Sequence, residues 1–270
     1  MFILYDNEMN KLDFPDGVKP LDIFISSLQK ERTTQTLEGV HGVIDFGSEY
    51  RDREIRLKLL LMSADTQDYR LQRDETYALL DDVAYISEKY QAGKRYSVRI
   101  DDSYIPERFD NNQTFATAEV NCTTVNFPFA ESVKTTQHIE NNGLQFGQGW
   151  FYGMGLLYDE STHKYTHNTL DFDIYNAGNV QIEPFHQDFT ITVKNATKGY
   201  TLENKTTGDK FVYTGNTTGT IEIKGGIVTI NKIQVFRETN RKILTLDVNN
   251  NQFRQNQNRE VIFNFRFYYK

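Results

Sequence analysis

His163 and His167 stand four residues apart, an interval that on a helix would let two imidazoles bind one metal ion. Here the interval falls in the polar, turn-like segment 161–168, where that spacing has no such meaning. We therefore favour two solvated loop histidines over a metal site. The chain has one cysteine, Cys122, which excludes an intrachain disulfide and a Cys-based zinc site. The sequence predicts no metal and no cofactor.

Asp171 and Asp173 alternate along a predicted strand and so point to the same face. Paired carboxylates can bind calcium or carry out acid-base chemistry. The simpler interpretation makes them the solvent face opposite Leu170, Phe172 and Ile174. Cys122 lies at an inward-looking strand position without a recognisable base nearby, so we expect a packed thiol rather than a nucleophile.

Glycines at positions 147, 149, 153 and 155 suggest a phosphate-binding loop. They do not satisfy the dinucleotide pattern, because position 152 is a tyrosine and large aromatic residues crowd the stretch. A flexible or interface-forming linker fits better. No catalytic triad order or nucleophile elbow is present, so we expect a protein that is not an enzyme. A glycoside hydrolase, with two carboxylates brought together by folding, stays an open alternative.

Composition indicates a globular chain rich in large flat side chains. Hydrophobic residues make up 38% and charged residues 25% of the 270 positions, with 19 Phe and 16 Tyr. The net charge of −7 is uneven: residues 1–135 carry 16 basic and 24 acidic side chains, and the remainder carries 14 and 13. Such a front half is poorly suited to hold nucleic acid, so we expect no specific nucleic-acid binding.

The first residues do not have the features of a signal peptide, since segment 1–8 has no basic region and no small-residue cleavage site. No apolar run approaches the length that spans a bilayer. We expect neither export by a signal peptide nor membrane insertion. The single cysteine favours synthesis in a reducing compartment.

The first half combines strands with one helix. Apolar residues alternate along 55–61, which predicts a half-buried strand. An amphipathic helix is predicted near 65–92, with Asp65 or Asp68 as N-cap and Gly93 just past its end. Strands follow at 96–100 and 118–122, with a loop at 110–112 between them.

The second half alternates short apolar segments with turn signals. It predicts strands at 170–174, 189–193, 211–213, 221–223, 227–230 and 243–248, and a final strand that ends in segment 261–269. The expected fold is mainly β: an N-terminal β-sandwich with one long amphipathic helix packed on it, then a C-terminal antiparallel β-sandwich. The expected domains are 1–135, a Gly/aromatic linker or arm at 136–164, and 165–270.

The order of these parts resembles the distal tail protein family of siphophages. The resemblance spans the chain and rests on five features: the leading strand, the strand at 55–61 that feeds a helix, the Phe-Pro-Phe junction in 125–130, the Asn-Ala-Gly-Asn segment in 175–180 followed by Pro184, and the closing strand at 263–269.

This resemblance implies a structural virion protein without catalytic residues. Its N-terminal domain would close into a homohexameric ring at the tail tip, and its C-terminal domain would be a galectin-like sandwich pointing outward. Implied partners are the tail tube protein, the tail-associated or tip protein, and receptor-binding or baseplate proteins for host attachment. DNA would leave through the ring, and the protein would be made in the bacterial host cytoplasm.

Five aromatic residues are the candidate interface contacts, at the domain junction or between protomers: Phe127, Phe129, Trp150, Phe151 and Tyr152. They could equally fill a cleft between two domains. The alternative function is a carbohydrate-binding module that recognises host cell-wall polymers, in which Trp150, Phe151, Tyr152 and the tyrosines of the second half stack on sugar rings.

Overall fold

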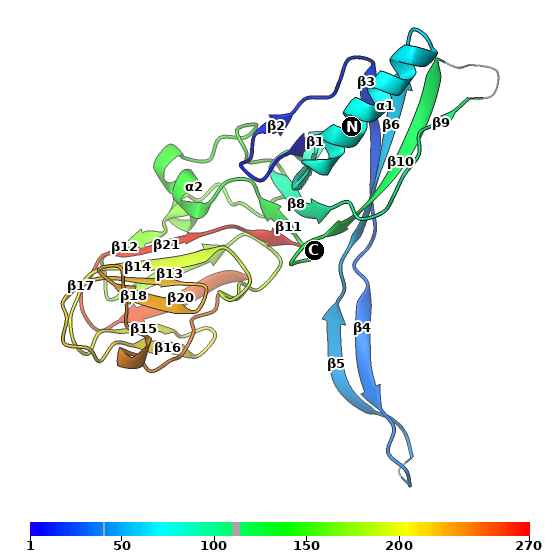
Figure 1. Ribbon diagram of the computed structural model, residues 1–270. Coiled ribbons are helices and arrows are strands. Elements are labelled where there is room, and N and C mark those ends of the chain that lie inside the picture. The colour runs from blue at the N-terminus through cyan, green and yellow to red at the C-terminus, as the bar shows by residue number, and fades with distance from the viewer. Residues whose placement is uncertain (40, 110–113) are drawn as a thin grey trace. The chain divides into compact units, whose positions relative to one another are not determined.

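The computed structural model describes residues 1–39, 41–109 and 114–270. The chain divides into two compact units, unit 1 (Met1–Ala130) and unit 2 (Glu131–Lys270). Both are mainly β with antiparallel sheets, as predicted (Figure 1). The loop predicted at 110–112 lies outside the described residues. Neither α-helix of the described chain is long and apolar enough to cross a membrane.

Unit 1 is built on one antiparallel path of strands, in the order β2-β1-β7-β8-β10-β6-β3. The strands of this unit are β1 (Phe2–Tyr5), β2 (Lys11–Leu12), β3 (Val18–Ile25), β4 (Lys30–Gln35), β5 (Ile44–Tyr50), β6 (Glu54–Met62), β7 (Tyr85–Glu88), β8 (Lys94–Arg99), β9 (Glu107–Arg108) and β10 (Phe115–Thr124), and β11 (Ala130–Ser132) begins at its last residue.

The core of unit 1 lies on one face of β6 and β10. Ile55, Leu57, Leu59 and Leu61 of β6 are buried, as their alternation predicted. Each of these residues lies opposite a buried residue of β10: Ile55 pairs with Cys122 at one end of the strand, and Leu61 pairs with Ala116 at the other. This face carries the largest share of apolar burial in the unit.

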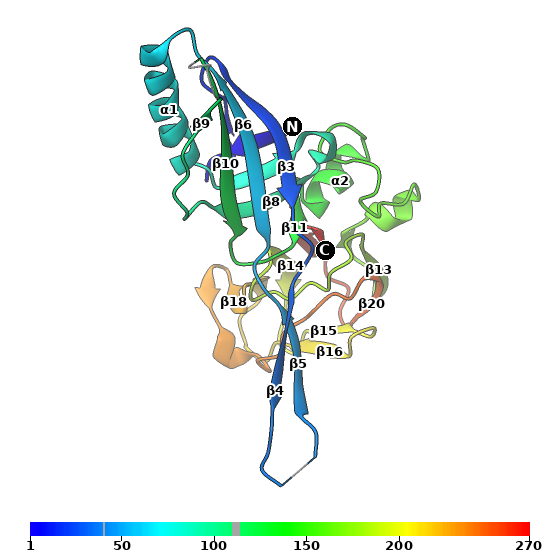
Figure 2. The same cartoon turned by 90° about the vertical axis from the view of Figure 1, so that its right-hand side faces the viewer.

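Helix α1 (Thr66–Asp81) packs its buried face against this core, and Figure 2 shows it alongside β6 and β10. The Asp65 carboxylate caps it by accepting from the backbone N–H groups of Gln67 and Asp68, at 2.8 Å each. The prediction of a helix to residue 92 was wrong. After Asp81 the chain forms β7, which pairs with β1, and Ile86 is buried there as a strand residue.

Strands β4 and β5 form a two-stranded ribbon of their own, called the arm below. The ribbon runs on from β3 and β6 and extends away from the sheet of unit 1 (Figure 2). Its register runs from Lys30 opposite Tyr50 to Gln35 opposite Ile44. Every residue of β4 and β5 is exposed except Tyr50, which is half-buried.

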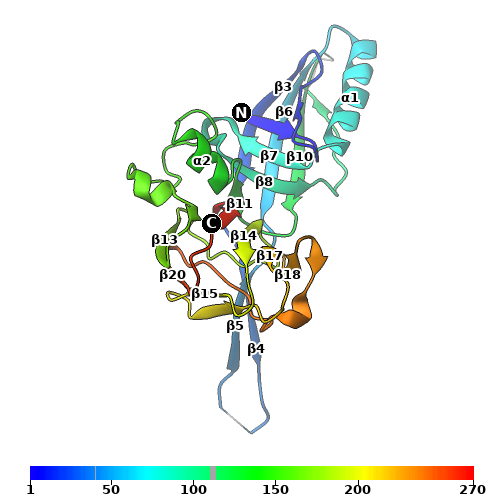
Figure 3. The same cartoon turned by 90° about the vertical axis from the view of Figure 1, so that its left-hand side faces the viewer.

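Unit 2 contains two antiparallel sheets. One has the order β12-β21-β14-β17-β18-β19 and the other β13-β20-β15-β16; β14, β17 and β18 are visible side by side in Figure 3. The strands are β12 (Thr166–His167), β13 (Asp171–Asn176), β14 (Phe189–Ala196), β15 (Thr201–Asn204), β16 (Asp209–Val212), β17 (Gly219–Lys224), β18 (Ile227–Ile230), β19 (Ile233–Gln234), β20 (Asn249–Gln255), β21 (Val261–Phe265) and β22 (Tyr268–Tyr269).

Phenylalanine rings join the two sheets of unit 2. Phe263 of β21 contacts Phe253 of β20 at 4.9 Å between ring centroids and Phe172 of β13 at 6.1 Å. Val261, Phe263 and Phe265 are all buried, as the alternation of the closing strand predicted. The two sheets therefore share one aromatic core.

One predicted strand of unit 2 was wrong, and four strands were missed: β12, β15, β19 and β20. Segment 243–248 forms no strand, only a single bridge between Leu246 and Ile182. The strand β20 begins directly after this segment, at Asn249, and its buried positions are Asn251, Phe253 and Gln255. Buried amides replace apolar side chains there because each makes hydrogen bonds, such as Asn251 Oδ1 with the backbone N–H of Asp247 at 2.8 Å.

Segment 136–164 belongs to unit 2 and contains α2 (Thr136–Asn142) and the 3₁₀ turn η2 (Glu160–His163). The Thr136 hydroxyl ties α2 to β21, because it donates to the Phe263 carbonyl and accepts from the Phe265 N–H, each at 3.1 Å. Trp150 and Met154 are buried. The segment is thus packed into its unit along much of its length.

Candidate functional site

The two histidines have different environments. His163 is 7% exposed at the end of η2, so the expectation of two solvated loop histidines was wrong for it. Burial lowers its pKa. His167 lies in β12, where its ring stacks on Phe172 at 4.6 Å and its Nε2 is 3.1 Å from the Lys164 carbonyl. The described residues hold no cluster of three His, Cys, Asp or Glu side chains suited to a metal ion.

Asp171 and Asp173 lie on the exposed face of β13. Asp171 forms an ion pair with Lys205 at 2.7 Å, which lowers the pKa of its carboxyl group. Its other cation is Arg254, at 4.0 Å. Asp171 therefore takes part in surface ion pairs with Lys205 and Arg254, and we do not assign it a role as an acid or base.

Cys122 is buried within β10, as predicted. Burial raises the pKa of its thiol to about 12, so the sulfur stays protonated at neutral pH. A protonated, enclosed thiol is a poor nucleophile. Its role in unit 1 is packing.

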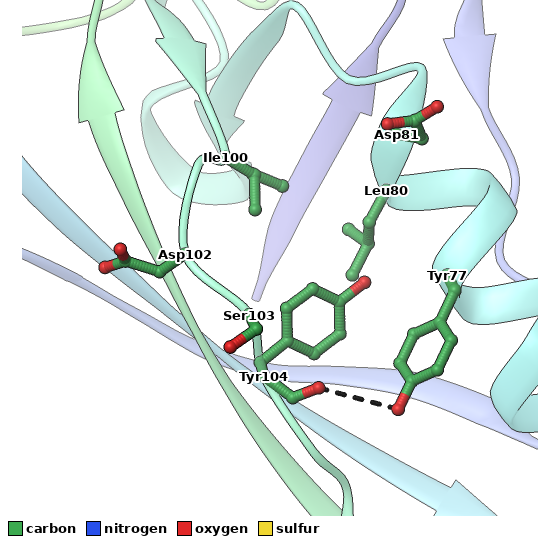
Figure 4. Close-up of a pocket in the computed structure, with 7 residues that line it drawn as sticks. All are labelled: Tyr77, Leu80, Asp81, Ile100, Asp102, Ser103 and Tyr104. Atoms are coloured by element: carbon green, nitrogen blue, oxygen red, sulfur yellow. Dashed lines mark hydrogen bonds between the residues drawn. The ribbon is translucent and has the colours of Figure 1, made fainter.

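A hollow of about 330 Å³ in unit 1 lies between α1 and the segment after β8 (Figure 4). The rings of Tyr77 and Tyr104 meet edge to face in it, 5.3 Å apart, and burial raises the pKa of Tyr104 to about 12. The carboxylates of Asp81 and Asp102 lie at opposite sides of the view and point away from each other. They therefore do not form the facing pair that glycoside hydrolysis requires.

The junction residues Phe127 and Phe129 are half-buried at the end of unit 1. Phe129 meets Tyr50, the last residue of the arm, edge to face at 5.6 Å. That contact fixes the base of the arm to the end of the unit. It covers part of the Phe129 ring.

The consecutive aromatic residues of unit 2 divide into buried and exposed ones. Trp150 is fully buried beside Phe267 and His138, with ring centroids 6.0 and 6.3 Å away. It is a core residue and cannot stack on a sugar. Tyr152 is 79% exposed, and its ring stacks on Phe146 at 4.4 Å with only 6° between the planes.

Phe146, on which Tyr152 stacks, lines a hollow of about 690 Å³ in unit 2, beside α2. Phe146 and Tyr158 line it together with the polar side chains of Glu160, His163 and Lys164. The sequence analysis did not single out Phe146 or Tyr158. The one feature of the sequence that could have indicated Phe146 and Tyr158 is their position in or near the Gly-aromatic stretch, because turns at glycine leave aromatic rings exposed.

The arm carries the second surface that the sequence analysis missed. Its large apolar side chains are exposed, Phe46 by 62% and Val43 by 60%, with Leu37 and Ile44 also open. Two ion pairs cross the ribbon, between Arg32 and Asp45 and between Arg51 and Glu31. Exposed apolar residues on an isolated ribbon are typical of a protein interface.

The edge of the sheet in unit 1 is apolar too. Within the described residues, strand β3 pairs on one side only, with β6, and its Leu21 and Phe24 are 39% and 45% exposed. The Arg56 guanidinium lies 5.3 Å from the centre of the Phe24 ring. An unpaired edge with open apolar side chains is suited to contact another chain.

Comparisons with known proteins found one matching family model and several similar structures. Residues 17–122 match the family model described as phage tail protein RIFT-related domain. This segment contains β3 to β6, α1, β7 to β9 and nearly all of β10, together with the arm. A search of curated proteins found no match.

Among solved structures, the chain is similar to SPP1 Dit, whose structure is described as a paradigm of the hub adsorption apparatus in phages that infect Gram-positive bacteria. The identity is 16%, the TM-score is 0.65, and the alignment covers 99% of each chain. The phage P2 baseplate structure in its activated conformation with Ca aligns at 11% identity and a TM-score of 0.44, over 98% of this chain and 97% of the other. The resemblance to siphophage distal tail proteins, which the sequence indicated, is confirmed, and the fold is that of SPP1 Dit.

Proposed function

We propose that this protein is a structural hub of a siphophage tail, located at the tail tip of the virion. It joins the tail tube to the tip or baseplate and forms a platform for receptor-binding proteins. The observation that carries the proposal is the match of residues 17–122 to a phage tail domain. The similarity of the whole chain to SPP1 Dit in fold supports it.

Unit 1 forms the ring in this proposal. A head-to-tail ring needs two different, complementary surfaces on each protomer. Unit 1 offers the apolar arm and the open edge of β3, and both lie within the matched segment. A two-stranded ribbon is marginal in water without cover, so contact with the next protomer would stabilise the arm.

The acidic front half has a role in the same arrangement. Residues 1–135 carry 24 acidic against 16 basic side chains. Around a channel through which DNA leaves, such a surface repels phosphate groups and lets the DNA pass. Exchanging exposed Asp and Glu of unit 1 for Asn and Gln in phage particles is expected to slow DNA ejection, measured by dye uptake. Ejection at an unchanged rate would contradict this role.

The mass of the purified protein tests the hub proposal. Light scattering during size exclusion, over a range of concentrations, is expected to show a hexamer or a rise towards one, and electron microscopy of that fraction should show closed rings. A strict monomer at every concentration, which also fails to join tail tube protein, would overturn the proposal.

A further inference from the structure

We propose that one side of unit 2, called the basic face below, is the docking surface for a partner protein segment that combines apolar side chains with carboxylates. The basic face consists of β18, β19, the 3₁₀ turn η3 (Phe236–Glu238) and the residues that follow it up to Lys242 (Figure 3, orange). The inference deepens the proposed function and rests on it for the source of the partner, which is a receptor-binding or baseplate protein that docks on the platform.

The basic face lies where the two sheets of unit 2 end. Strand β19 is the last strand of one sheet, and β16 is the last strand of the other. The chain after β19 joins the two sheets. The Val235 N–H donates to the Val228 carbonyl of β18 at 2.9 Å, and the Asn240 N–H donates to the Val212 carbonyl of β16 at 3.1 Å. In the described part of the chain, β19 pairs with β18 alone, and such an open edge is a place where another chain can dock.

Exposed apolar side chains are concentrated on and beside the basic face. Ile227, Ile233 and Phe236 are 53%, 69% and 38% exposed. Phe185, at 60%, lies with its ring against Gly226, the residue before β18. These four are half of the eight large apolar side chains that are exposed among the described residues of unit 2. Single exposed apolar residues are ordinary, but several of them beside an open edge are typical of a protein contact.

The cations of the basic face have no carboxylate partners. Segment 224–242 carries five basic side chains and one acidic side chain, Glu238. All five are exposed and none forms an ion pair with another described residue: Lys224, Lys232, Arg237, Arg241 and Lys242. Elsewhere in unit 2, surface cations such as Lys205 pair with a carboxylate. The whole chain has a net charge of −7, so this local excess of positive charge selects an acidic partner.

The hairpin of β18 and β19 presents these side chains in a fixed shape. Its turn residues Asn231 and Lys232 both have positive φ, 50° and 69°, as a two-residue turn that matches the twist of the strands requires. Asn231 also links the turn to β17. Its Oδ1 accepts from the Thr220 N–H at 3.1 Å, and its own N–H donates to the Thr220 carbonyl at 3.0 Å. A surface fixed in this way loses little conformational entropy when a partner binds.

The combination of cations and apolar side chains selects one kind of occupant. A second copy docked through the same face would place cations against cations, which is unfavourable. A polyanion without apolar groups, such as a glycerol-phosphate polymer, would neutralise the cations but leave Ile227 and Ile233 in water. A protein segment whose carboxylates flank apolar side chains satisfies both parts of the face.

The test places a photoreactive benzophenone amino acid at position 233 of the full chain in phage particles, which are then irradiated. The cross-linked peptide, identified by mass spectrometry, is expected to come from another virion protein and to contain apolar residues beside Asp or Glu. Position 170 is the matched control, because Leu170 is 44% exposed in unit 2 but lies outside the basic face, and it should give no adduct with that peptide. No adduct at position 233, an adduct only with a second copy, or a peptide without carboxylates overturns the proposal.

A synthetic copy of the cross-linked peptide then measures both parts of the face on the purified full chain. Arg237→Glu and Ile233→Ser should each raise its Kd about tenfold. Lys164→Glu, at an exposed cation of unit 2 outside the basic face, should leave the Kd unchanged. A tenfold higher ionic strength should raise the Kd about threefold or more, because salt screens exposed charges.

A Kd that does not respond to salt or to either variant overturns the docking surface. The hub proposal can fail separately. Absence of the chain from purified particles contradicts the hub proposal and this inference with it, whereas its presence there without an adduct at position 233 contradicts the docking surface alone.

Discussion

Two antiparallel strand pairs follow one another in unit 1, and they differ in what covers them. Where β3 pairs with β6, the side chains of Leu57, Leu59 and Leu61 are shielded from water. Where β4 pairs with β5, no side chain is buried. The backbone pairing is of the same kind in both, so the difference lies in side-chain burial. Pairing without burial gives little net stability, because strand hydrogen bonds largely replace those made with water.

The arm has cross-strand ion pairs where the β3 and β6 pair has apolar burial. Its cross-strand ion pairs join Arg32 to Asp45 and Arg51 to Glu31. Ion pairs that remain in water contribute little to stability. A ribbon with exposed Phe46 and Val43 therefore has more to gain from a partner than from its own contacts. We therefore expect the β3 and β6 pair to stabilise the fold of unit 1, and the arm to contact another protein chain.

The largest expected effect is on the buried pair. Leu57→Ala removes a fully buried side chain and should lower the free energy of unfolding by about 2–5 kcal/mol. Ile44→Ala is the control on the arm, and it should change stability by less than about 0.5 kcal/mol. Urea titration of the monomer measures both. Equal losses in the two variants would show that the arm shares the core's stability.

The next effect concerns assembly. Phe46→Ala should leave the unfolding midpoint unchanged but weaken self-association about tenfold or more, since full burial of a Phe side chain is worth roughly 1.5–3 kcal/mol. Analytical ultracentrifugation measures the association constant. Tyr90→Ala, on an exposed ring outside the arm, should associate as the wild type does. Normal association of the Phe46 variant would exclude this ring from the protomer contact.

Period-2 patterns identified the strands with apolar burial, such as β6 and β21, because burial on one face leaves a trace in the sequence. The arm left no such trace, since a ribbon exposed on both faces needs no alternation. Strand β20 was missed for another reason: its buried positions hold Asn251 and Gln255, whose hydrogen bonds appear only in three dimensions. The end of α1 was misplaced because pairing of β7 with β1 overrides a spacing that also fits a helix.

The candidate site in unit 2 shows the same limit. Trp150 and Tyr152 stand two residues apart in one aromatic stretch, yet one is fully buried and the other open. Composition identified the stretch, but the turns that orient each ring decide which one a ligand can reach. The burial of His163 in a polar segment could not be predicted, because it depends on packing between α2 and η2.

A smaller effect tests the helix that covers the sheet of unit 1. Asp65→Ala removes the carboxylate that accepts from the N–H groups of Gln67 and Asp68, and should lower the free energy of unfolding by about 1 kcal/mol. Asp74→Ala, in the middle of the same helix, should leave the midpoint unchanged. Thermal unfolding measures both. An equal loss in the two variants would indicate an effect of negative charge along the helix and not of the cap.

The smallest effect is the pH response of the arm itself. Arg32 lowers the pKa of Asp45, and Arg51 lowers that of Glu31, from ordinary values of 3.8 and 4.5. A lowered pKa in the folded state means that the ion pairs stabilise the ribbon above those ordinary values, and that this contribution is lost as the pH falls through the lowered ones. Cross-strand NMR contacts between β4 and β5 should therefore weaken on acidification before those between β6 and β10 do. Asp45→Asn should remove part of this pH dependence. If the contacts between β4 and β5 and those between β6 and β10 weaken at the same pH, the two ion pairs do not stabilise the arm, and this difference between the arm and the buried strands is contradicted.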